Sequence, residues 1–177
     1  MKIILIGIQG SGKSTQGNLL SSKFKLPYLS SGHIFREMTK EKTKWGRYVK
    51  ETMNAGHLIP DTETIAIINE YLGKAEYKNG YILDGFPRTI TQAQQFKDGA
   101  DAVVYLHISD KEALKRLSLR KSEREDDTSE AIKKRIELFH SFTEPVLAYY
   151  REKGILHEVD GEKSIDHIHK EIVKRLK

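Results

Sequence analysis

A glycine-rich segment near the start of the chain constrains its fold more than any other feature. Residues 7–15 read GIQGSGKST, which satisfies the pattern G-x-x-x-x-G-K-[ST] in full. The segment directly follows a run of Ile and Leu, and such a run is typical of a strand buried on both faces of a parallel sheet. A strand that leads through this loop into a helix indicates the α/β class.

The residue types of the loop fit a site for a nucleoside triphosphate. Glycines let backbone N–H groups turn toward phosphate oxygens, and the following helix adds the positive end of its dipole. In this pattern Lys13 bridges the β- and γ-phosphates, and the hydroxyl of Ser14 is placed to ligate Mg²⁺. We therefore expect the chain to bind a nucleotide together with Mg²⁺.

Further apolar runs predict the rest of the sheet. They cover residues 26–29, 81–83, 102–108 and 155–159, and the stretches between them are long enough to hold helices. This alternation is typical of a doubly wound parallel sheet. Toward the C-terminus, Ile165, Ile168 and Ile172 recur at helical spacing after Ser164, a residue suited to an N-cap. A length of 177 residues fits one domain over residues 1–177.

Composition narrows the classes of partner and compartment. Lys and Arg number 30 against 25 Asp and Glu, and the net charge of +5 favours an anionic partner. The chain has no Cys, which excludes a disulfide framework, a thiolate nucleophile and a Cys-based zinc site. The first apolar run stops at Gln9 and is too short for an export signal or a membrane anchor, so we expect a cytoplasmic protein without a membrane partner.

The residues after the apolar run 81–83 indicate the second part of the site. Asp84 follows a strand beside the phosphate loop, where a partner of Mg²⁺ is expected. Arg88 offers a bidentate fork for a second phosphate group. Gln92 has two interpretations, because its amide can read a base edge or cap a helix together with Thr89. The Asn-Lys-x-Asp and Asp-x-x-Gly motifs of a switch GTPase do not occur.

Together these motifs resemble those of the adenylate kinase family over essentially the whole chain. The strings in common are the loop with Thr15-Gln16, the Ser30-Ser31-Gly32 turn with Arg36, residues 84–88 with Gln92, and Arg124-x-Asp126-Asp127 before Lys134-Arg135. The resemblance implies a P-loop NTPase-type parallel five-stranded β-sheet wrapped by α-helices, and a reaction in which MgATP and AMP give two ADP. It also implies an NMP-binding region at residues 30–60 and a minimal lid segment at residues 120–127.

The resemblance further assigns site residues one by one. The ATP-binding residues are Gly10, Ser11, Gly12, Lys13, Ser14, Thr15, Arg120 and Lys163. The AMP-binding residues are Ser31, Arg36, His57, Leu58, Ile59, Gly85, Phe86, Pro87, Arg88, Gln92, Arg124 and Arg135. The catalytic positive charges are Lys13, Arg88, Arg120, Arg124 and Arg135, and Mg²⁺ is held by Ser14 and Asp84, partly through water. Asp127 either orders the arginines or caps the next helix, with Glu130 at the third helical position.

The chain departs from the family pattern at the lid. Only residues 121–123 separate Arg120 from Arg124, and a zinc-bound lid is excluded because its Cys ligands are missing. A lid excludes water and grips the donor base. We therefore predict relaxed donor selectivity, with GTP or UTP used within about tenfold of ATP, because few contacts are left to supply more than ~1.4 kcal/mol.

Smaller departures bear on the metal and on the acceptor. His33 stands where the family has Asp, which leaves Asp84 as the sole obvious acidic anchor for the metal, and Gln9 and Ser14 stand where the family has Pro and Gly. A UMP/CMP kinase, the alternative enzyme, would carry Ala in place of Ser31 and Asn in place of Gln92, so AMP is favoured.

One alternative from another class is a nucleotide-dependent RNA-binding module, which would explain the basic charge. That module needs aromatic residues clustered with basic ones or an RNA-binding signature, and the chain has neither, so we expect no nucleic-acid partner. We expect a monomer by default. A homo-oligomer stays open, because a neighbouring subunit could exclude water in place of a lid.

Overall fold

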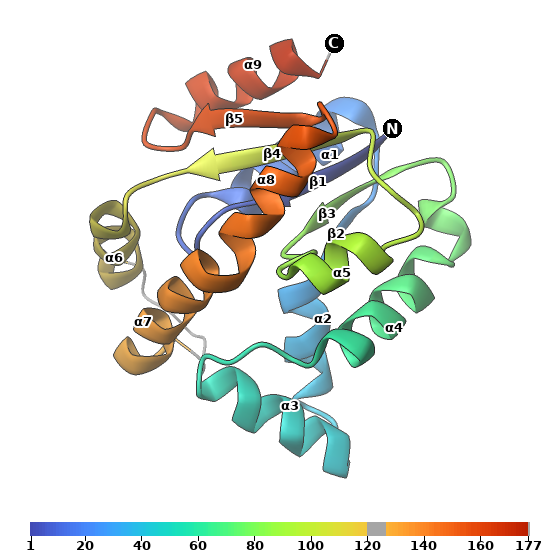
Figure 1. The fold of residues 1–177 in the computed structure, drawn as a ribbon, viewed down its shortest axis with the longest axis vertical. Helices are drawn as coiled ribbons and strands as arrows, with labels where there is room; N and C mark the ends of the chain where they lie inside the picture. Colours follow the sequence, from blue (N-terminus) through green and yellow to red (C-terminus); the bar gives the residue numbers. More distant parts are fainter. Residues whose placement is uncertain (120–126, 177) are drawn as a thin grey trace.

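The computed structural model describes residues 1–119 and 127–176 and has a five-stranded parallel sheet at its centre (Figure 1). The strands are β1 (Lys2–Ile6), β2 (Tyr28–Ser30), β3 (Tyr81–Asp84), β4 (Ala102–His107) and β5 (Leu156–Asp160), in the spatial order β2-β3-β1-β4-β5. Each neighbouring pair runs parallel. The predicted α/β fold class is therefore confirmed.

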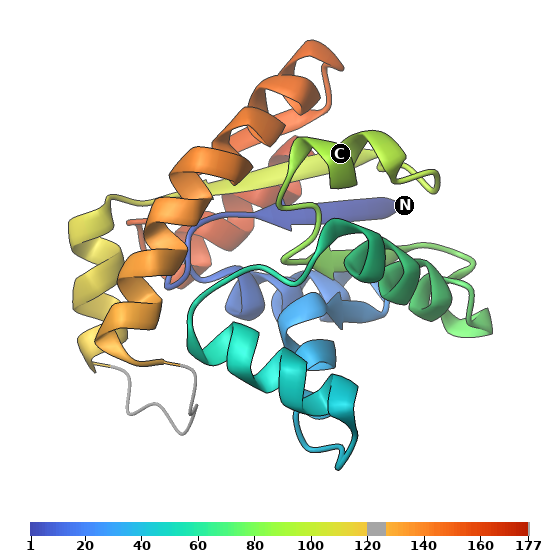
Figure 2. The same cartoon turned by 60° about the horizontal axis from the view of Figure 1, so that its bottom comes forward.

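Helices connect the strands and cover both faces of the sheet (Figures 1 and 2). They are α1 (Lys13–Phe24), α2 (Ser31–Met38), α3 (Lys44–Asn54), α4 (Asp61–Leu72), α5 (Ile90–Gln95), α6 (Asp110–Leu119), α7 (Ser129–Leu138), α8 (Glu144–Glu152) and α9 (Ile165–Arg175). A 3₁₀ turn (Ala75–Tyr77) precedes β3, and a π-helical turn (Phe139–Thr143) joins α7 to α8. The helices α1 and α9 lie on one face, and α4, α5 and α8 lie on the other.

Alternation along the strands explains this two-sided burial. In β1, Ile3 and Leu5 pack into the cluster that includes residues of α1 and α9. Ile4 and Ile6 point the other way, into the cluster that includes residues of α4, α5 and α8. All four side chains are at most 3% exposed, which is why the strand reads as a continuous apolar run rather than as alternating apolar and polar residues.

Two local details can be traced to single residues. The strand expected at residues 26–29 begins instead at Tyr28, because Pro27 has no N–H for the ladder, although its carbonyl accepts from the Ile82 N–H at 2.9 Å. The N-cap expected at Ser164 is confirmed, since its side chain accepts from the His167 N–H at 3.4 Å at the start of α9.

A third, smaller cluster lies away from the sheet between α2 and α3. It consists of Phe35, Val49, Met53 and Ile59, each at most 9% exposed. These residues fall inside the segment 30–60 to which sequence assigned NMP binding. Within residues 1–119 and 127–176, no helix is both long and apolar enough to span a bilayer.

Candidate active site

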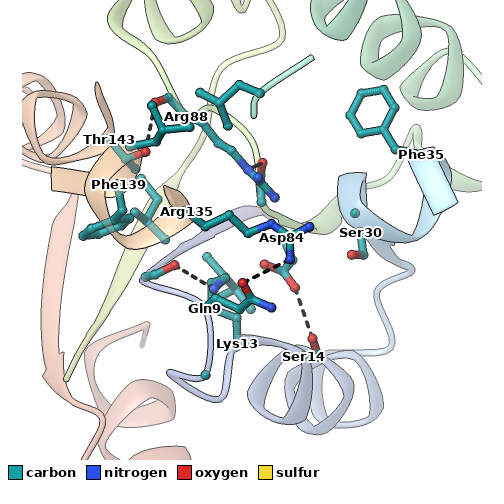
Figure 3. Close-up of a pocket in the computed structure, with 18 of the residues that line it drawn as sticks. Gln9, Lys13, Ser14, Ser30, Phe35, Asp84, Arg88, Arg135, Phe139 and Thr143 are labelled. Carbon is teal, nitrogen blue, oxygen red and sulfur yellow. Dashed lines mark hydrogen bonds between the residues drawn. The ribbon is translucent and has the colours of Figure 1, made fainter. Parts of the chain in front are cut away.

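A cavity of about 430 Å³ opens at the carboxyl ends of β1 and β3 (Figure 3). Its wall combines the phosphate loop, the first turns of α2, residues 57–59, residues 84–92, and side chains from α6, α7 and the π-helical turn. A second cavity of about 290 Å³ adjoins it, and the two share Gly10, Gly12, Thr15 and Arg116. Ligands of parallel α/β sheets bind at this edge, so the fold and the cavities agree on where the site lies.

The phosphate loop curls because two glycines adopt a left-handed backbone. Gly10 has φ +89° and Gly12, the N-cap of α1, has φ +91°, a region that L side chains rarely occupy. Lys13 folds over the loop, and its Nζ donates to the carbonyls of Gly7 at 2.7 Å and Ile8 at 3.0 Å. The lysine charge is thereby kept in the wall of the cavity, at the N-terminus of α1.

Asp84 ends β3 with its carboxylate held from two sides. Its Oδ2 accepts from the Tyr28 hydroxyl at 2.6 Å and from the Ser14 hydroxyl at 3.4 Å, and the residue is only 5% exposed. The Tyr28 ring packs against α1 where Gly17 leaves room, since a Cβ on Gly17 would overlap the ring. Burial and the adjacent Asp84 charge raise the pKa of Tyr28, which therefore stays a hydrogen-bond donor.

Arg88 is anchored by the turn that follows β3. Its Nε donates to the Gly85 carbonyl at 2.7 Å, and its own carbonyl accepts from the Thr143 hydroxyl at 2.9 Å. Gly85 has φ +82°, and a Cβ there would come within 2.6 Å of the Ser31 Oγ and 3.0 Å of the Arg88 Nη2. The turn therefore needs glycine both for its backbone and for the space that the arginine occupies.

Gln92 takes part in a network that joins α5 to α4. Its backbone N–H donates to the Thr89 hydroxyl at 3.1 Å, so the predicted cap at Thr89 is confirmed. Its side chain Oε1 accepts from the Arg88 N–H at 2.7 Å, and its Nε2 donates to Asp61 Oδ1 at 2.8 Å. The residue is 2% exposed yet lines the cavity, so capping by Thr89 and base reading by Gln92 are compatible.

Arg135 reaches the cavity from α7 and is tied to three other parts of the chain (Figure 3). Its Nη1 donates to Asp127 Oδ1 and to Gln9 Oε1, both at 3.2 Å, and its Nη2 donates to the Met53 carbonyl at 2.9 Å. Gln9 closes the network by donating to Asp127 at 2.7 Å. The side chains of Arg135 and Asp127 are 16% and 3% exposed, so this ion pair is largely shielded from water.

The second interpretation of Asp127, a helix cap, is wrong. The N-cap of α7 is Thr128, whose hydroxyl accepts from the Ala131 N–H at 3.2 Å. Asp127 is instead turned toward Arg135. Asp127 and Thr128 are both residue types suited to an N-cap, and the ion pair of Asp127 with Arg135 decides between them.

Most of the predicted residues line one cavity or the other. The larger cavity includes Gly10, Gly12, Lys13, Ser14, Thr15, Arg36, His57, Leu58, Ile59, Asp84, Gly85, Pro87, Arg88, Gln92 and Arg135. Ser11 and Lys163 line the smaller one. Arg120 and Arg124 lie outside the described residues, as does the lid segment apart from Asp127.

Two predicted AMP-site residues lie behind the cavity wall. The Phe86 side chain is 1% exposed and packs edge-on against Phe96 in the core, with ring centroids 5.2 Å apart, so it offers no contact to a ligand. Ser31 is also 1% exposed, and its hydroxyl has no hydrogen-bond partner among the described residues. That hydroxyl lies beside Gly85, directly behind the wall.

Sequence reasoning missed four residues that contribute to the site. Arg116, in the last turn of α6, lines both cavities. The other three make hydrogen bonds to site residues: Tyr28 to Asp84, Asp61 to Gln92, and Gln9 to Arg135. The position of Arg116, shortly before the assigned Arg120, was the one available signal. The other three act through partners 31 to 126 residues away.

Comparison with known proteins agrees with this geometry. The family model described as adenylate kinase matches residues 5–155. An adenylate kinase of Leptospira biflexa is 38% identical, and one of Caldicellulosiruptor bescii is 35% identical, each over 99% of both chains. An adenylate kinase of Archaeoglobus fulgidus is 33% identical over 97% of this chain and 96% of its own.

The Caldicellulosiruptor alignment extends over 212 positions, although this chain has 177 residues, so that relative is the longer protein. The Leptospira alignment extends over only 184 positions, so a relative of nearly the same length also carries this name. On the family match and on these near-complete alignments, the chain belongs to the adenylate kinase family.

Proposed function

We propose that this protein transfers the γ-phosphoryl group of MgATP to AMP, reversibly, to form two ADP. One observation carries the proposal: a single cavity has the phosphate loop in one wall and Arg36, Arg88 and Gln92 in another. The first group suits a triphosphate, and the second suits a monophosphate with a base that an amide can read. The relatives described above carry the name of this activity.

The chemistry needs positioning and positive charge rather than a general base. The acceptor is a phosphate oxygen that is already anionic at neutral pH, so no side chain has to remove a proton from it. Lys13, Arg88 and Arg135 line the same cavity and would neutralise charge on the transferring phosphoryl oxygens. We propose the same role for Arg120 and Arg124. The hydrogen bonds of Arg88 and Arg135 to backbone carbonyls fix both guanidinium groups before substrate arrives.

Mg²⁺ is the metal that fits the residues at the phosphate loop. The Ser14 hydroxyl and the Asp84 carboxylate lie within 3.4 Å of each other, and hard oxygen donors are the ligands that Mg²⁺ prefers. We propose that these two residues hold the ion, Asp84 through water. When bound, Mg²⁺ supplies positive charge to the phosphate oxygens of the donor.

The smaller cavity is the proposed site of the donor base. It is lined by Arg116, Lys163 and Ile165 together with the phosphate loop, and Ile165 is 55% exposed. An open wall of this kind supports the expectation that GTP and UTP serve within about tenfold of ATP. Initial rates with each donor at saturating AMP test it, and a strict requirement for ATP would contradict it.

The decisive experiment measures ADP formation from MgATP and AMP. Replacing Arg88 by Ala should lower kcat by a factor on the order of 10³, because the variant loses a positive charge that stabilises the transferring phosphoryl group. Arg47→Ala is the matched control, because Arg47 is exposed on α3 and lies outside both cavity walls. Wild-type rates in Arg88→Ala would refute the assignment. Equal use of UMP and AMP would favour the UMP/CMP kinase alternative.

A further inference from the structure

Asp61 is the first residue of α4, and the sequence predicted no role for it. Its Oδ1 accepts from the Thr89 hydroxyl at 3.0 Å and from Gln92 Nε2 at 2.8 Å. Asp61 does not line the cavity, whereas Gln92 does. The carboxylate therefore acts behind the wall, on a side chain that faces the acceptor site.

The two partners of the Gln92 side chain, the Asp61 carboxylate and the Arg88 backbone N–H, leave its amide only one direction. An ionised carboxylate can only accept hydrogen bonds, so Asp61 must face the nitrogen of the amide. A backbone N–H can only donate, so the Arg88 N–H must face the oxygen. Turning the amide over would set its N–H groups against the Arg88 N–H and its oxygen against the Asp61 carboxylate. Because the residue is only 2% exposed, water could not replace the lost hydrogen bonds.

The fixed direction leaves a defined pair of groups for a ligand. The amide has two N–H donors and two acceptor lone pairs, and among the described residues one of each is used. One donor and one acceptor remain side by side. They match a base edge on which an amino group lies next to an unprotonated ring nitrogen, as in a 6-aminopurine. A 6-oxopurine presents the opposite order, a carbonyl next to a ring N–H.

We infer that Asp61 is a specificity-determining positioning residue, which makes the acceptor site select 6-amino over 6-oxo purine monophosphates by fixing the direction of the Gln92 amide. The inference rests on the proposed function, because it needs AMP to bind against Gln92. When phosphate and ribose hold the base in one pose, the base of AMP presents the edge that matches the Gln92 amide. The base of inosine monophosphate (IMP) presents a mismatched edge in the same pose. Mismatched buried polar groups reject a ligand strongly.

The test compares kcat/KM for AMP and for IMP at a fixed, saturating MgATP concentration. We expect the wild-type protein to favour AMP at least a hundredfold. Asp61→Asn replaces an obligate acceptor by a group that can also donate, so the AMP:IMP ratio should fall about tenfold. Asp61→Ser, which also both donates and accepts, should lower the ratio as well and serves if the Asn variant does not fold. Asp61→Glu keeps the acceptor character and should keep the preference.

Glu63→Gln is the matched control, because it removes the same charge from the first turn of α4 outside the cavity wall. General destabilisation lowers the rates with AMP and IMP alike, so it cannot move their ratio. A ratio within twofold of wild type in folded Asp61→Asn or Asp61→Ser overturns the inference alone. A wild-type protein that forms no ADP from AMP overturns the proposed function and this inference with it.

Discussion

Replacing Tyr28 by Phe removes one hydroxyl and leaves the packed ring in place. That hydroxyl donates to the Asp84 carboxylate at 2.6 Å, and the residue that accepts is 5% exposed. A hydrogen bond to a charged group contributes about 1.5–3 kcal/mol, so we expect the free energy of unfolding to fall by about 2 kcal/mol. For a chain of this size the midpoint of thermal unfolding should drop by roughly 4–8 °C.

Urea denaturation of the ligand-free protein at neutral pH measures this loss. Tyr105→Phe is the control, since Tyr105 is 8% exposed and its hydroxyl makes no hydrogen bond with the described residues. That variant should lose little stability. If the free energy of unfolding of Tyr28→Phe lies within about 0.5 kcal/mol of that of wild type, or if the two variants are equally destabilised, the bond from Tyr28 to Asp84 does not stabilise the fold.

Three further predictions concern other parts of the site and its supports. Asp127→Ala should lower the free energy of unfolding, measured by urea denaturation, by about 3 kcal/mol, because it removes a carboxylate that pairs with the largely buried Arg135 guanidinium; a loss below 1 kcal/mol would contradict this. Gly85→Ala should raise the KM for AMP and lower the unfolding midpoint, because the new Cβ meets Ser31 and Arg88; unchanged values for both would refute it. His140→Gln should destabilise the protein by at most about 1 kcal/mol at pH 5.5 and by little at pH 9, measured as urea midpoints.

The sign of the His140 effect follows from its partners. Hydrogen bonds to Glu144 at 2.6 Å and to Asp110 at 2.9 Å raise the pKa of the imidazole above its ordinary value of 6.5. The stabilisation is therefore fully present below pH 6.5 and is lost as the pH rises through the raised pKa. The ring is 42% exposed, so solvent screening keeps the effect small. An equal loss at both pH values would show that charge plays no part.

The strands and the phosphate loop were predictable because local chemistry determines them. A strand buried on both faces has to be apolar throughout, as Ile3 to Ile6 are, and a backbone that wraps phosphate needs glycines where Gly10 and Gly12 stand. The supports of the site were not predictable in this way. Gln9 meets Asp127, 118 residues further along, and no pattern within either segment records that contact.

Between these extremes lie residues whose local preferences allowed two outcomes. Asp127 and Thr128 are both suited to cap α7, and the bonds of Asp127 to Arg135 and to the distant Gln9 decide that its carboxylate turns toward them while Thr128 takes the cap. At Gln92 the cap is made by the Thr89 hydroxyl, which accepts from the Gln92 backbone N–H, whereas the Gln92 amide bonds Arg88 and Asp61 and takes no part in the cap. Tertiary contacts thus settled the first ambiguity, and in the second they leave the reading of a base edge by the amide as a prediction.

The small cluster between α2 and α3 bears on how residues 30–60, the proposed NMP-binding region, can move. Phe35, Val49, Met53 and Ile59 are each at most 9% exposed and form one cluster, against which Ile67 of α4 also packs. If α2 and α3 turn together as one rigid body, the contacts within the cluster are kept and only those to Ile67 change, so the displacement costs little hydrophobic free energy. The bond from Arg135 to the Met53 carbonyl would change with any such rotation. A hinge motion of residues 30–60 would therefore change the contacts of Arg135, which is proposed to act on the transferring phosphoryl group.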